Sequence, residues 1–364
     1  MTNRERIRAT AFCEKTDRAP MILYLGAWKE TLRKWEEEEG FQNNADLATI
    51  AGYDAGIKET GEIKLGLFPD FGYETIEEKE HTIIRRNSFG VTEECIKNGS
   101  TIPRGIAYPV TCMEDWEQIK NERLNPDSPG RFPPDWEKIC DDYNKSDYAV
   151  QIGSYPYGLF GTVRELMGLE GTLIALYDNP ELIKDMMDHL TNLWLAIYEK
   201  AACHLKIDCV HIWEDMSGKQ GSLISPGMIR EFMIPNYLKI KNFANKQGAF
   251  VMLDTDGNCD ELIPVFIEGG INLLMPFEVA AGSDVVKYRS QYPGLSMLGG
   301  IDKREVARDR CAIDDELARI EPLLSETGYF PALDHLIHPQ VSYANFKYYT
   351  ERLRYLINKH SNSK

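Results

Sequence analysis

Three residues combine types and spacing that can bind a metal ion or move a proton: Asp254, Asp256 and His335. The two aspartates form a DxD pair at the end of the apolar run FVML. Side chains two apart on a strand point to the same face. Carboxylate and imidazole groups together suit zinc or a harder divalent ion, and both can serve as general acids or bases. We therefore predict all three as metal ligands, with Asp256 and His335 also catalytic, although a lone DxD pair or histidine can be purely structural.

Acidic residues also follow the other apolar runs. The further members of this set are Glu214, Asp215, Glu278, Asp302 and Asp334, with Lys303 as the nearest cation. Carboxylates that lie close together raise one another's pKa, so a metal ion, a cationic ligand or protonation must relieve the repulsion. We predict Glu214 and Glu278 as catalytic or supporting acids, and Asp302 and Lys303 as substrate contacts. The alternative for Asp215, Asp302 and Asp334 is capping of the helices that follow.

Aromatic side chains are frequent near the same positions. Candidates for substrate contact are Tyr24, Trp28, Tyr155, Tyr157 and Trp213, and Phe277 lies nearby. Aromatic faces attract quaternary ammonium groups, so a pocket for a flat or methylated cation is one interpretation. Ordinary packing of rings around a sheet is the other.

The elements that must position these residues alternate between short apolar runs and amphipathic stretches, which is typical of parallel βα units. The strands that we expect are Pro20–Leu25, Tyr53–Lys58, Ala149–Gly153, Cys209–Trp213, Phe250–Asp254, Ile271–Met275, Leu295–Gly299 and Tyr329–Leu333. Eight strands of this kind predict an α/β fold that is a single (β/α)8 TIM barrel. In such a barrel the loops after the strands form the active site.

Long helices are expected over residues 180–204, 226–247 and 341–360, supported by Ser225-Pro226 as a start and Gly248 as an end. Residues 73–110 instead alternate apolar and polar residues, as in an antiparallel meander. We interpret this segment as an insertion between the second and third strands. The chain is then one domain over residues 1–364, with an insertion at about 70–140 that includes a Pro-rich loop.

The composition excludes several functions. The chain has 41 basic and 57 acidic side chains and a net charge of −16, which argues against binding of nucleic acid. No run of about 18 apolar residues is present to cross a membrane, and the first residues lack a secretion signal, so we expect a cytoplasmic protein. The eight cysteines are scattered and are expected to be free thiols.

Five segments spread over nearly the whole chain form one set of motifs: RERIRATAFCEKTDRAP, the EDM block, LDTDGNCDELIPVFIEGGINLLMPFEVAAG, GGIDKREVA and PALDHLIHPQVSYANFKYY. In these segments the chain resembles the uroporphyrinogen decarboxylase superfamily. The resemblance implies a (β/α)8 barrel. It also implies one of several activities, because the superfamily contains decarboxylases, methylcobalamin:coenzyme M methyltransferases and other corrinoid-linked methyltransferases.

Two departures from the family patterns bear on the choice between these activities. The decarboxylases carry an arginine-rich motif after the first strand, whereas this chain reads MILYLGAWKETLRKW, with only Lys29 and Arg33 nearby. The zinc methyltransferases carry His-x-Cys-Gly after the fifth strand and Cys after the eighth, and the matching positions here are Asp254, Asp256 and His335. Zinc is therefore suspected, with oxygen ligands in place of thiolates.

The resemblance thus implies a corrinoid-dependent methyltransferase that moves a methyl group between a small methylated substrate and a corrinoid protein. Methylcobalamin would be carried by that partner protein, since this chain shows no cobalamin-binding segment. A homodimer is a further expectation from the family. The alternative activities are a decarboxylase, that is, a carboxy-lyase acting on a carboxylated small molecule, and a non-catalytic binding protein.

Overall fold

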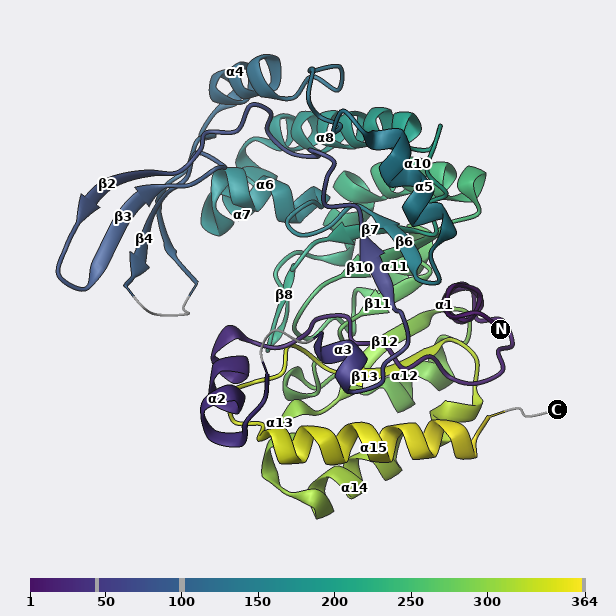
Figure 1. Ribbon diagram of the computed structural model, residues 1–364. Helices are drawn as coiled ribbons and strands as arrows, with labels where there is room; N and C mark the ends of the chain where they lie inside the picture. Colours follow the sequence, from purple (N-terminus) through teal and green to yellow (C-terminus); the bar gives the residue numbers. More distant parts are fainter. Residues whose placement is uncertain (43–45, 98–101, 362–364) are drawn as a thin grey trace.

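The computed structural model describes residues 1–42, 46–97 and 102–361. Its centre is a parallel sheet of seven strands that curls into a half barrel (Figure 1). In spatial order the strands are β1 (Ile57–Glu59), β6 (Ala149–Ile152), β7 (Cys209–Trp213), β10 (Phe250–Asp254), β11 (Leu273–Met275), β12 (Ser296–Ile301) and β13 (Tyr329–Leu333). Six of the eight expected strands therefore lie in this sheet within a few residues of their predicted bounds.

Alternate residues of these strands build two separate cores. Phe250 and Met252 of β10 point into the barrel, where they join an interior cluster with Leu298 and Phe330. Val251 and Leu253, which point to the opposite face, belong to the larger cluster under the helices. Since side chains on a strand alternate between faces, Asp254 continues the inward row at the carboxyl end of β10.

The expected first strand, Pro20–Leu25, is wrong. These residues form no strand, and the only bridge near them joins Ala27 to Ile337. Local contacts replace a ladder: the Asp54 carboxylate accepts the amide of Met21 at 2.9 Å, and the carbonyl of Met21 accepts the amide of Asp54 at 2.7 Å. The second strand is also shorter than expected, because β1 begins only at Ile57.

The antiparallel insertion is confirmed. It is a four-stranded meander between β1 and β6, in the order β2-β3-β4-β5, and it projects from the body as an arm (Figure 1). The strands of the arm are β2 (Glu74–Glu78), β3 (Thr82–Arg86), β4 (Thr92–Ile96) and β5 (Arg104–Ala107). A small hairpin, β8 (Ser217–Gly218) with β9 (Gly221–Ser222), follows β7.

Helices cover the outer face of the sheet. The longer ones are α1 (Asn3–Ala11), α2 (Lys29–Glu39), α4 (Met113–Arg123), α5 (Trp136–Lys145), α6 (Leu159–Met167), α7 (Leu169–Asp178), α8 (Pro180–Ala201), α10 (Ile234–Gln247), α14 (Arg310–Ile320) and α15 (Tyr343–Lys359). The shorter ones are α3 (Leu47–Ile50), α9 (Pro226–Met228), η1 (Ile229–Met233), α11 (Ile263–Glu268), η2 (Val279–Ala281), α12 (Val285–Gln291), α13 (Lys303–Arg308) and η3 (Glu321–Ser325).

The three long helices predicted from the sequence are confirmed, with one irregularity. Residues 226–247 are helical throughout, but Ile229–Met233 forms a π-helical turn. Pro235 lies two residues after this turn and lacks an amide hydrogen, which removes one regular helical hydrogen bond at this point. Among the described helices, none has the length and apolar character needed to cross a bilayer.

Candidate active site

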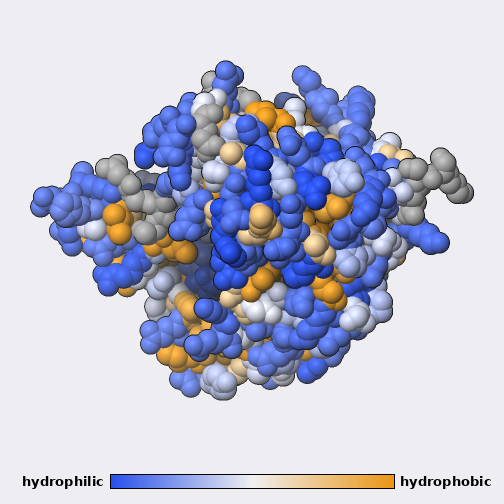
Figure 2. Space-filling model, turned by 90° about the horizontal axis from the view of Figure 1, so that it is seen from below, coloured by the Kyte–Doolittle hydropathy of each residue, from blue (hydrophilic) through white to orange (hydrophobic). Residues whose placement is uncertain are grey.

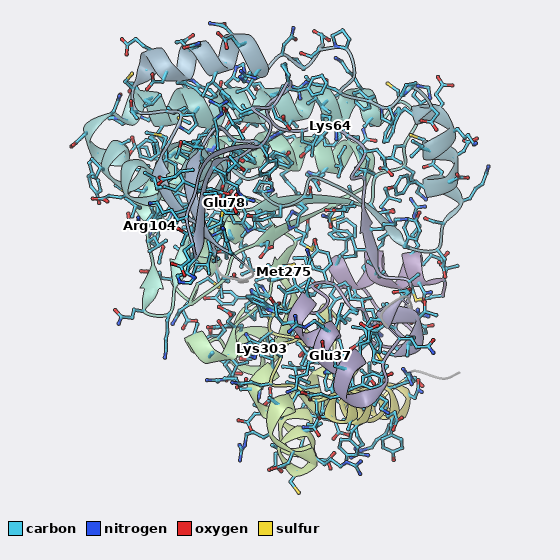
Figure 3. All side chains as sticks on the ribbon, turned by 60° about the vertical axis from the view of Figure 1, so that its left-hand side comes forward. Glu37, Lys64, Glu78, Arg104, Met275 and Lys303 are labelled. Carbon is cyan, nitrogen blue, oxygen red and sulfur yellow. The ribbon has the colours of Figure 1, made fainter. Side chains whose placement is uncertain are left out.

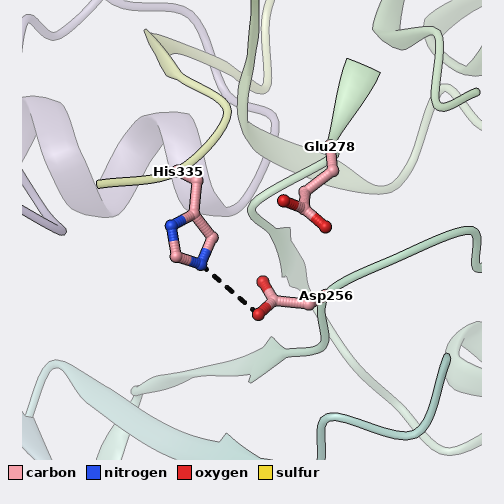
Figure 4. Close-up of side chains that lie close together, drawn as sticks. All are labelled: Asp256, Glu278 and His335. Atoms are coloured by element: carbon pink, nitrogen blue, oxygen red, sulfur yellow. Dashed lines mark ion pairs between the residues drawn. The ribbon is translucent and has the colours of Figure 1, made fainter. Parts of the chain in front are cut away.

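Asp256, Glu278 and His335 meet at the carboxyl ends of the strands (Figure 4). One ligand atom from each of the three side chains lies within 4.8 Å of the others. His335 Nε2 lies 3.4 Å from Asp256 Oδ2. Asp256 follows β10, Glu278 follows β11 and His335 follows β13, so the cluster joins separate parts of the barrel. We call it the Asp256 cluster.

Backbone conformation places Glu278 in this cluster. The preceding residue, Phe277, has a φ of 58°, a left-handed conformation that is costly for an aromatic residue. The amide of Gly257 donates to Glu278 Oε2 at 3.1 Å and ties the two loops together. Glycine at 257 is required, because its φ is 78° and an added Cβ would lie 2.6 Å from the carbonyl oxygen of Ser217.

Lys303 supplies positive charge beside the cluster. Its Nζ lies 3.4 Å from Glu278 Oε1 and 3.5 Å from Asp334 Oδ1. Asp334 is fully buried and also accepts the backbone amides of Lys303 and Val279. In the turned view, Met275 lies near the centre of the molecule and Lys303 below it, apart from Glu78 and Arg104 on the arm (Figure 3). Lys303 therefore links a residue of the Asp256 cluster to a buried structural acid.

Asp302, predicted as a substrate contact, has a structural role here. It is the N-cap of α13 and accepts the amide of Arg304 at 2.8 Å. The guanidinium of Arg304 also pairs with it at 2.6 Å. These contacts occupy both carboxylate oxygens, so the capping alternative describes Asp302.

Glu214, predicted as a catalytic acid, is turned away from the cluster. Its side chain is fully buried and accepts the amides of Leu159, Phe160 and Gly161 at the start of α6. The hydroxyl of Tyr237 donates to the same carboxylate at 2.7 Å. Burial raises the pKa of Glu214 to about 7, while these four donors oppose that rise. The residue directly after a strand can turn outward and cap a neighbouring helix, as Glu214 does, and its catalytic role stays a prediction.

Asp254 also differs from the prediction. It points into the barrel, but the three-residue set with metal-binding spacing contains Glu278 in its place. Asp254 Oδ2 lies 3.8 Å from Nε2 of His211, a buried residue of β7. Burial is the main cause of a raised pKa for Asp254, which His211 counteracts.

Sequence reasoning missed Arg164, on α6. Its Nη1 donates to Oδ2 of Asp215 at 2.7 Å and to the carbonyl oxygen of Asp215 at 2.6 Å. The guanidinium lies 5.4 Å from the ring centroid of Trp213. One signal in the sequence could have revealed Arg164. It lies in the helix that follows residues 154–158 (SYPYG), and this position places it beside the end of β7.

The five predicted aromatic contacts do not form one cage. Tyr155 packs edge-on against Trp213, with ring centroids 4.7 Å apart. Tyr24 donates its hydroxyl to Gln151 inside the barrel, Tyr157 packs near Trp194, and Trp28 packs near His338. Tyr24, Tyr155 and Trp213 thus remain near the barrel mouth, whereas each of the other two rings has a separate partner.

A hollow lies between the arm and the body of the molecule. The surface is recessed beside the arm (Figure 2). A cavity of about 560 Å³ is lined by Tyr73 and Arg85 from the arm and by Tyr155, Arg164 and Glu165 from the body. Burial raises the pKa of Glu165. The arm therefore extends the wall of the site beyond the barrel itself.

The charges at the mouth are partly compensated within the protein. Hydrogen bonding to Asp256 is the main cause of a raised pKa for His335, and burial raises the pKa of Asp334 and of Asp215. An imidazolium between two carboxylates is one way to balance the charge, and a divalent cation is another. The same three side chains can therefore hold either a proton or a metal ion.

Comparisons with known proteins agree with this architecture. The family model described as Uroporphyrinogen decarboxylase (URO-D) matches residues 96–355. Among solved structures, a methyltransferase from Methanosarcina mazei has a similar fold, with a TM-score of 0.59 and 14% sequence identity over 99% of this chain and 99% of that chain. No relative was found among curated proteins.

Proposed function

Since the chain belongs to the uroporphyrinogen decarboxylase family, we propose that it is a methyltransferase acting at the barrel mouth. It would move a methyl group between a small methylated substrate and a corrinoid held by a separate protein. The observation that carries this proposal is the Asp256 cluster, which joins two carboxylates and an imidazole at the strand ends. The fold likeness to a methyltransferase is compatible with it.

The cations near the first segment support methyl transfer over decarboxylation of a tetrapyrrole. Arg33 lies on α2 with its side chain 74% exposed and pairs with Glu37 at 3.4 Å. Such a residue does not project into the barrel to grip substrate carboxylates. The acids around the mouth would also repel a multiply anionic substrate.

The Asp256 cluster fits a divalent metal. Two carboxylates and one imidazole are a donor set that zinc accepts and that harder ions also tolerate. Asp256, Glu278 and His335 would hold the ion, and Lys303 lies beside the ligand Glu278, where its charge would compete with the ion. When bound, the ion supplies Lewis-acid activation of the atom that carries or receives the methyl group.

The remaining side chains of the mouth have roles that follow from their contacts. Asp254 and Tyr24 line the barrel interior below the cluster, and Tyr155 and Trp213 present aromatic surface beside it. Arg164 holds Asp215 and covers Trp213, so it orients this wall. The hollow between arm and body leaves an approach for the corrinoid of the partner protein.

The proposal is tested by incubating the purified protein with methylcobalamin or a methylated corrinoid protein across a panel of methoxylated and N-methylated compounds. Spectral change at cobalt that depends on one compound is expected, together with close to one bound divalent ion per chain. Asp256→Ala and Glu278→Gln should lose both the spectral change and the bound ion. Asp260→Asn is the matched control, because Asp260 lies four residues on and pairs with Lys287 instead.

A carboxy-lyase is the second candidate, favoured by one observation. Burial raises the pKa of both Asp254 and Asp334, which is suited to carboxyl groups kept protonated as acids. Release of carbon dioxide from a carboxylated compound, with a flat cobalt spectrum throughout the panel, would favour this activity and contradict methyl transfer.

A further inference from the structure

We propose that His211 is a positioning residue, whose ring holds the Asp254 carboxylate toward the substrate while Asp254 itself stays outside the metal ligand set. The inference rests on the proposed function, because it assigns a role at the same site. It concerns a histidine that neither the sequence motifs nor the Asp256 cluster includes.

His211 lies inside the barrel, one layer below Asp254. In the parallel register, His211 of β7 is paired with Met252 of β10, and Trp213 is paired with Asp254. Met252 belongs to the interior cluster, and so does Cys209, two residues before His211. Residues two apart on a strand share a face, so the imidazole projects into the barrel beneath the carboxylate.

The imidazole of His211 has no satisfied hydrogen bond within the described residues. The side chain is 3% exposed, and neither Nδ1 nor Nε2 has a partner at hydrogen-bonding distance. A buried polar group left in this state costs about 1–3 kcal/mol, so such groups are rarely left unused. The carboxylate that pairs with this ring is that of Asp254, whose Oδ2 lies 3.8 Å from Nε2, and a shift of under about 1 Å would bring this pair into the usual range.

Asp254 connects this interior pair to the mouth. Its side chain is 15% exposed, five times as much as that of His211, so part of it reaches solvent. Its backbone is fixed, since its carbonyl oxygen accepts the amide of Glu214 at 2.8 Å. Asp256 and His335 are close enough to influence its charge. A carboxylate oxygen tied to His211 leaves the other oxygen free to accept a hydrogen bond from a substrate.

Neighbouring groups give His211 little choice of partner. Tyr24 lies nearby, with ring centroids 6.4 Å apart, but its hydroxyl already donates to Gln151. The amide of Gln151 in turn donates to the carbonyl of Gly153. The donors of Tyr24 and Gln151 are therefore used elsewhere, and Asp254 supplies the carboxylate that lies within 4 Å of the imidazole.

The substrate class follows from this arrangement. A carboxylate that is held from below accepts a hydrogen bond from a hydroxyl, ammonium or amide N–H of the substrate, at a fixed distance from the Asp256 cluster. We therefore expect substrates with a hydrogen-bond donor besides the methyl-bearing atom, such as a hydroxyl on a methoxylated ring. Analogues that lack the donor should bind more weakly.

The test compares His211→Gln with His211→Leu, beside Met252→Leu as the matched interior control. The amide nitrogen of glutamine reproduces the position of Nε2, so His211→Gln should retain most activity. His211→Leu should raise KM about tenfold for the donor-bearing substrate and little for its donor-free analogue, with kcat and metal content nearly unchanged. A purely structural role would instead change all variants and both substrates alike.

A second measurement does not depend on activity. Imidazole ¹⁵N NMR of histidine-labelled protein should show the His211 signal shift in Asp254→Asn and stay fixed in Asp260→Asn. A shift without methyl transfer in any assay would contradict the proposed function and leave the pairing intact. Methyl transfer that is equal in His211→Leu and wild type, with no NMR shift, would overturn the positioning role.

Discussion

The ammonium of Lys303 lies 3.4 Å from Oε1 of Glu278, a residue of the Asp256 cluster. It therefore occupies one side of a carboxylate that a metal ion would also need. Two unit positive charges about 4 Å apart repel each other by about 1–4 kcal/mol, and the double charge of a divalent ion increases this repulsion. The lysine sets an upper limit on how tightly this site can hold a divalent ion, and it stabilises the site when no ion is bound.

Replacing Lys303 should tighten metal binding. In Lys303→Met the competing ammonium is lost, and the Kd for zinc should fall roughly tenfold, which corresponds to about 1.4 kcal/mol. Competition with a chromophoric chelator measures this change. Lys287→Met is the control, because Lys287 pairs with the exposed Asp260. An unchanged Kd in Lys303→Met would mean that the ion does not use Glu278.

The buried carboxyl of Glu214 should make stability depend on pH. Its pKa is raised to about 7, mainly by burial. The folded protein thus retains a proton that the unfolded chain releases near pH 4.3. The contribution of Glu214 to the free energy of unfolding is therefore full below about pH 4.3. It is lost as pH rises to about 7, by roughly 3 kcal/mol in all. Urea unfolding of wild type and Glu214→Gln at pH 5 and pH 8 measures it.

The difference between those two proteins isolates Glu214, since glutamine does not titrate. The stability of wild type relative to Glu214→Gln should be smaller at pH 8 than at pH 5. Tyr237→Phe provides a second variant, because removal of its hydroxyl, which lowers the pKa of Glu214, should move the window to higher pH. A difference that is the same at both pH values would contradict this assignment.

Gly299 should tolerate no side chain. Its φ is 110°, and an added Cβ would lie 1.8 Å from the carbonyl oxygen of Pro276, in the loop that carries Glu278. Gly299→Ala should therefore lower the free energy of unfolding by about 3 kcal/mol or more and displace Glu278. Thermal and urea unfolding measure the loss, and metal binding reports the displacement. Gly294→Ala, where nothing lies within 4 Å, should change stability by less than about 0.5 kcal/mol.

Removing Arg164 should weaken the wall beside the mouth. In Arg164→Met the carboxylate of Asp215 loses its charge partner, and the carbonyl oxygen of Asp215 loses its donor. The free energy of unfolding in urea should therefore fall by about 1–3 kcal/mol. Arg230→Met is the control, because its pair with Glu268 is about half exposed and should be worth under about 1 kcal/mol. Equal losses in the two variants would show that the Arg164 pair is no more than a surface contact.

Much of the fold could be predicted, because the spacing of apolar residues along a segment and its composition indicate which side chains are buried. The runs at β7, β10 and β13 are continuous and apolar, and the structure begins and ends these strands at the predicted residues. Pro20–Leu25 is equally apolar, but its backbone bonds to Asp54 instead of a neighbouring strand. Apolar character predicts that a segment is buried, and it does not reveal which backbone groups will pair.

The position of the site could be predicted better than the set of side chains that form it. Residues after strand ends do gather, which brings Asp256, Glu278 and His335 together. The direction of each side chain depends on single backbone angles, such as the φ of 58° at Phe277 and of 44° at Asp215. For this reason the sequence could not show that Glu214 faces α6, or that Glu278 and not Asp254 completes the cluster.

The irregular course of residues 20–25 leaves the barrel with a seam. Ile22 still fills the interior, yet this stretch is not joined to β1 or β13 by a continuous ladder. Each of β6, β7, β10, β11 and β12 is paired on both sides and cannot widen without breaking several hydrogen bonds. We therefore expect any widening of the barrel to occur along this seam, beside Tyr24, where no continuous ladder has to be broken.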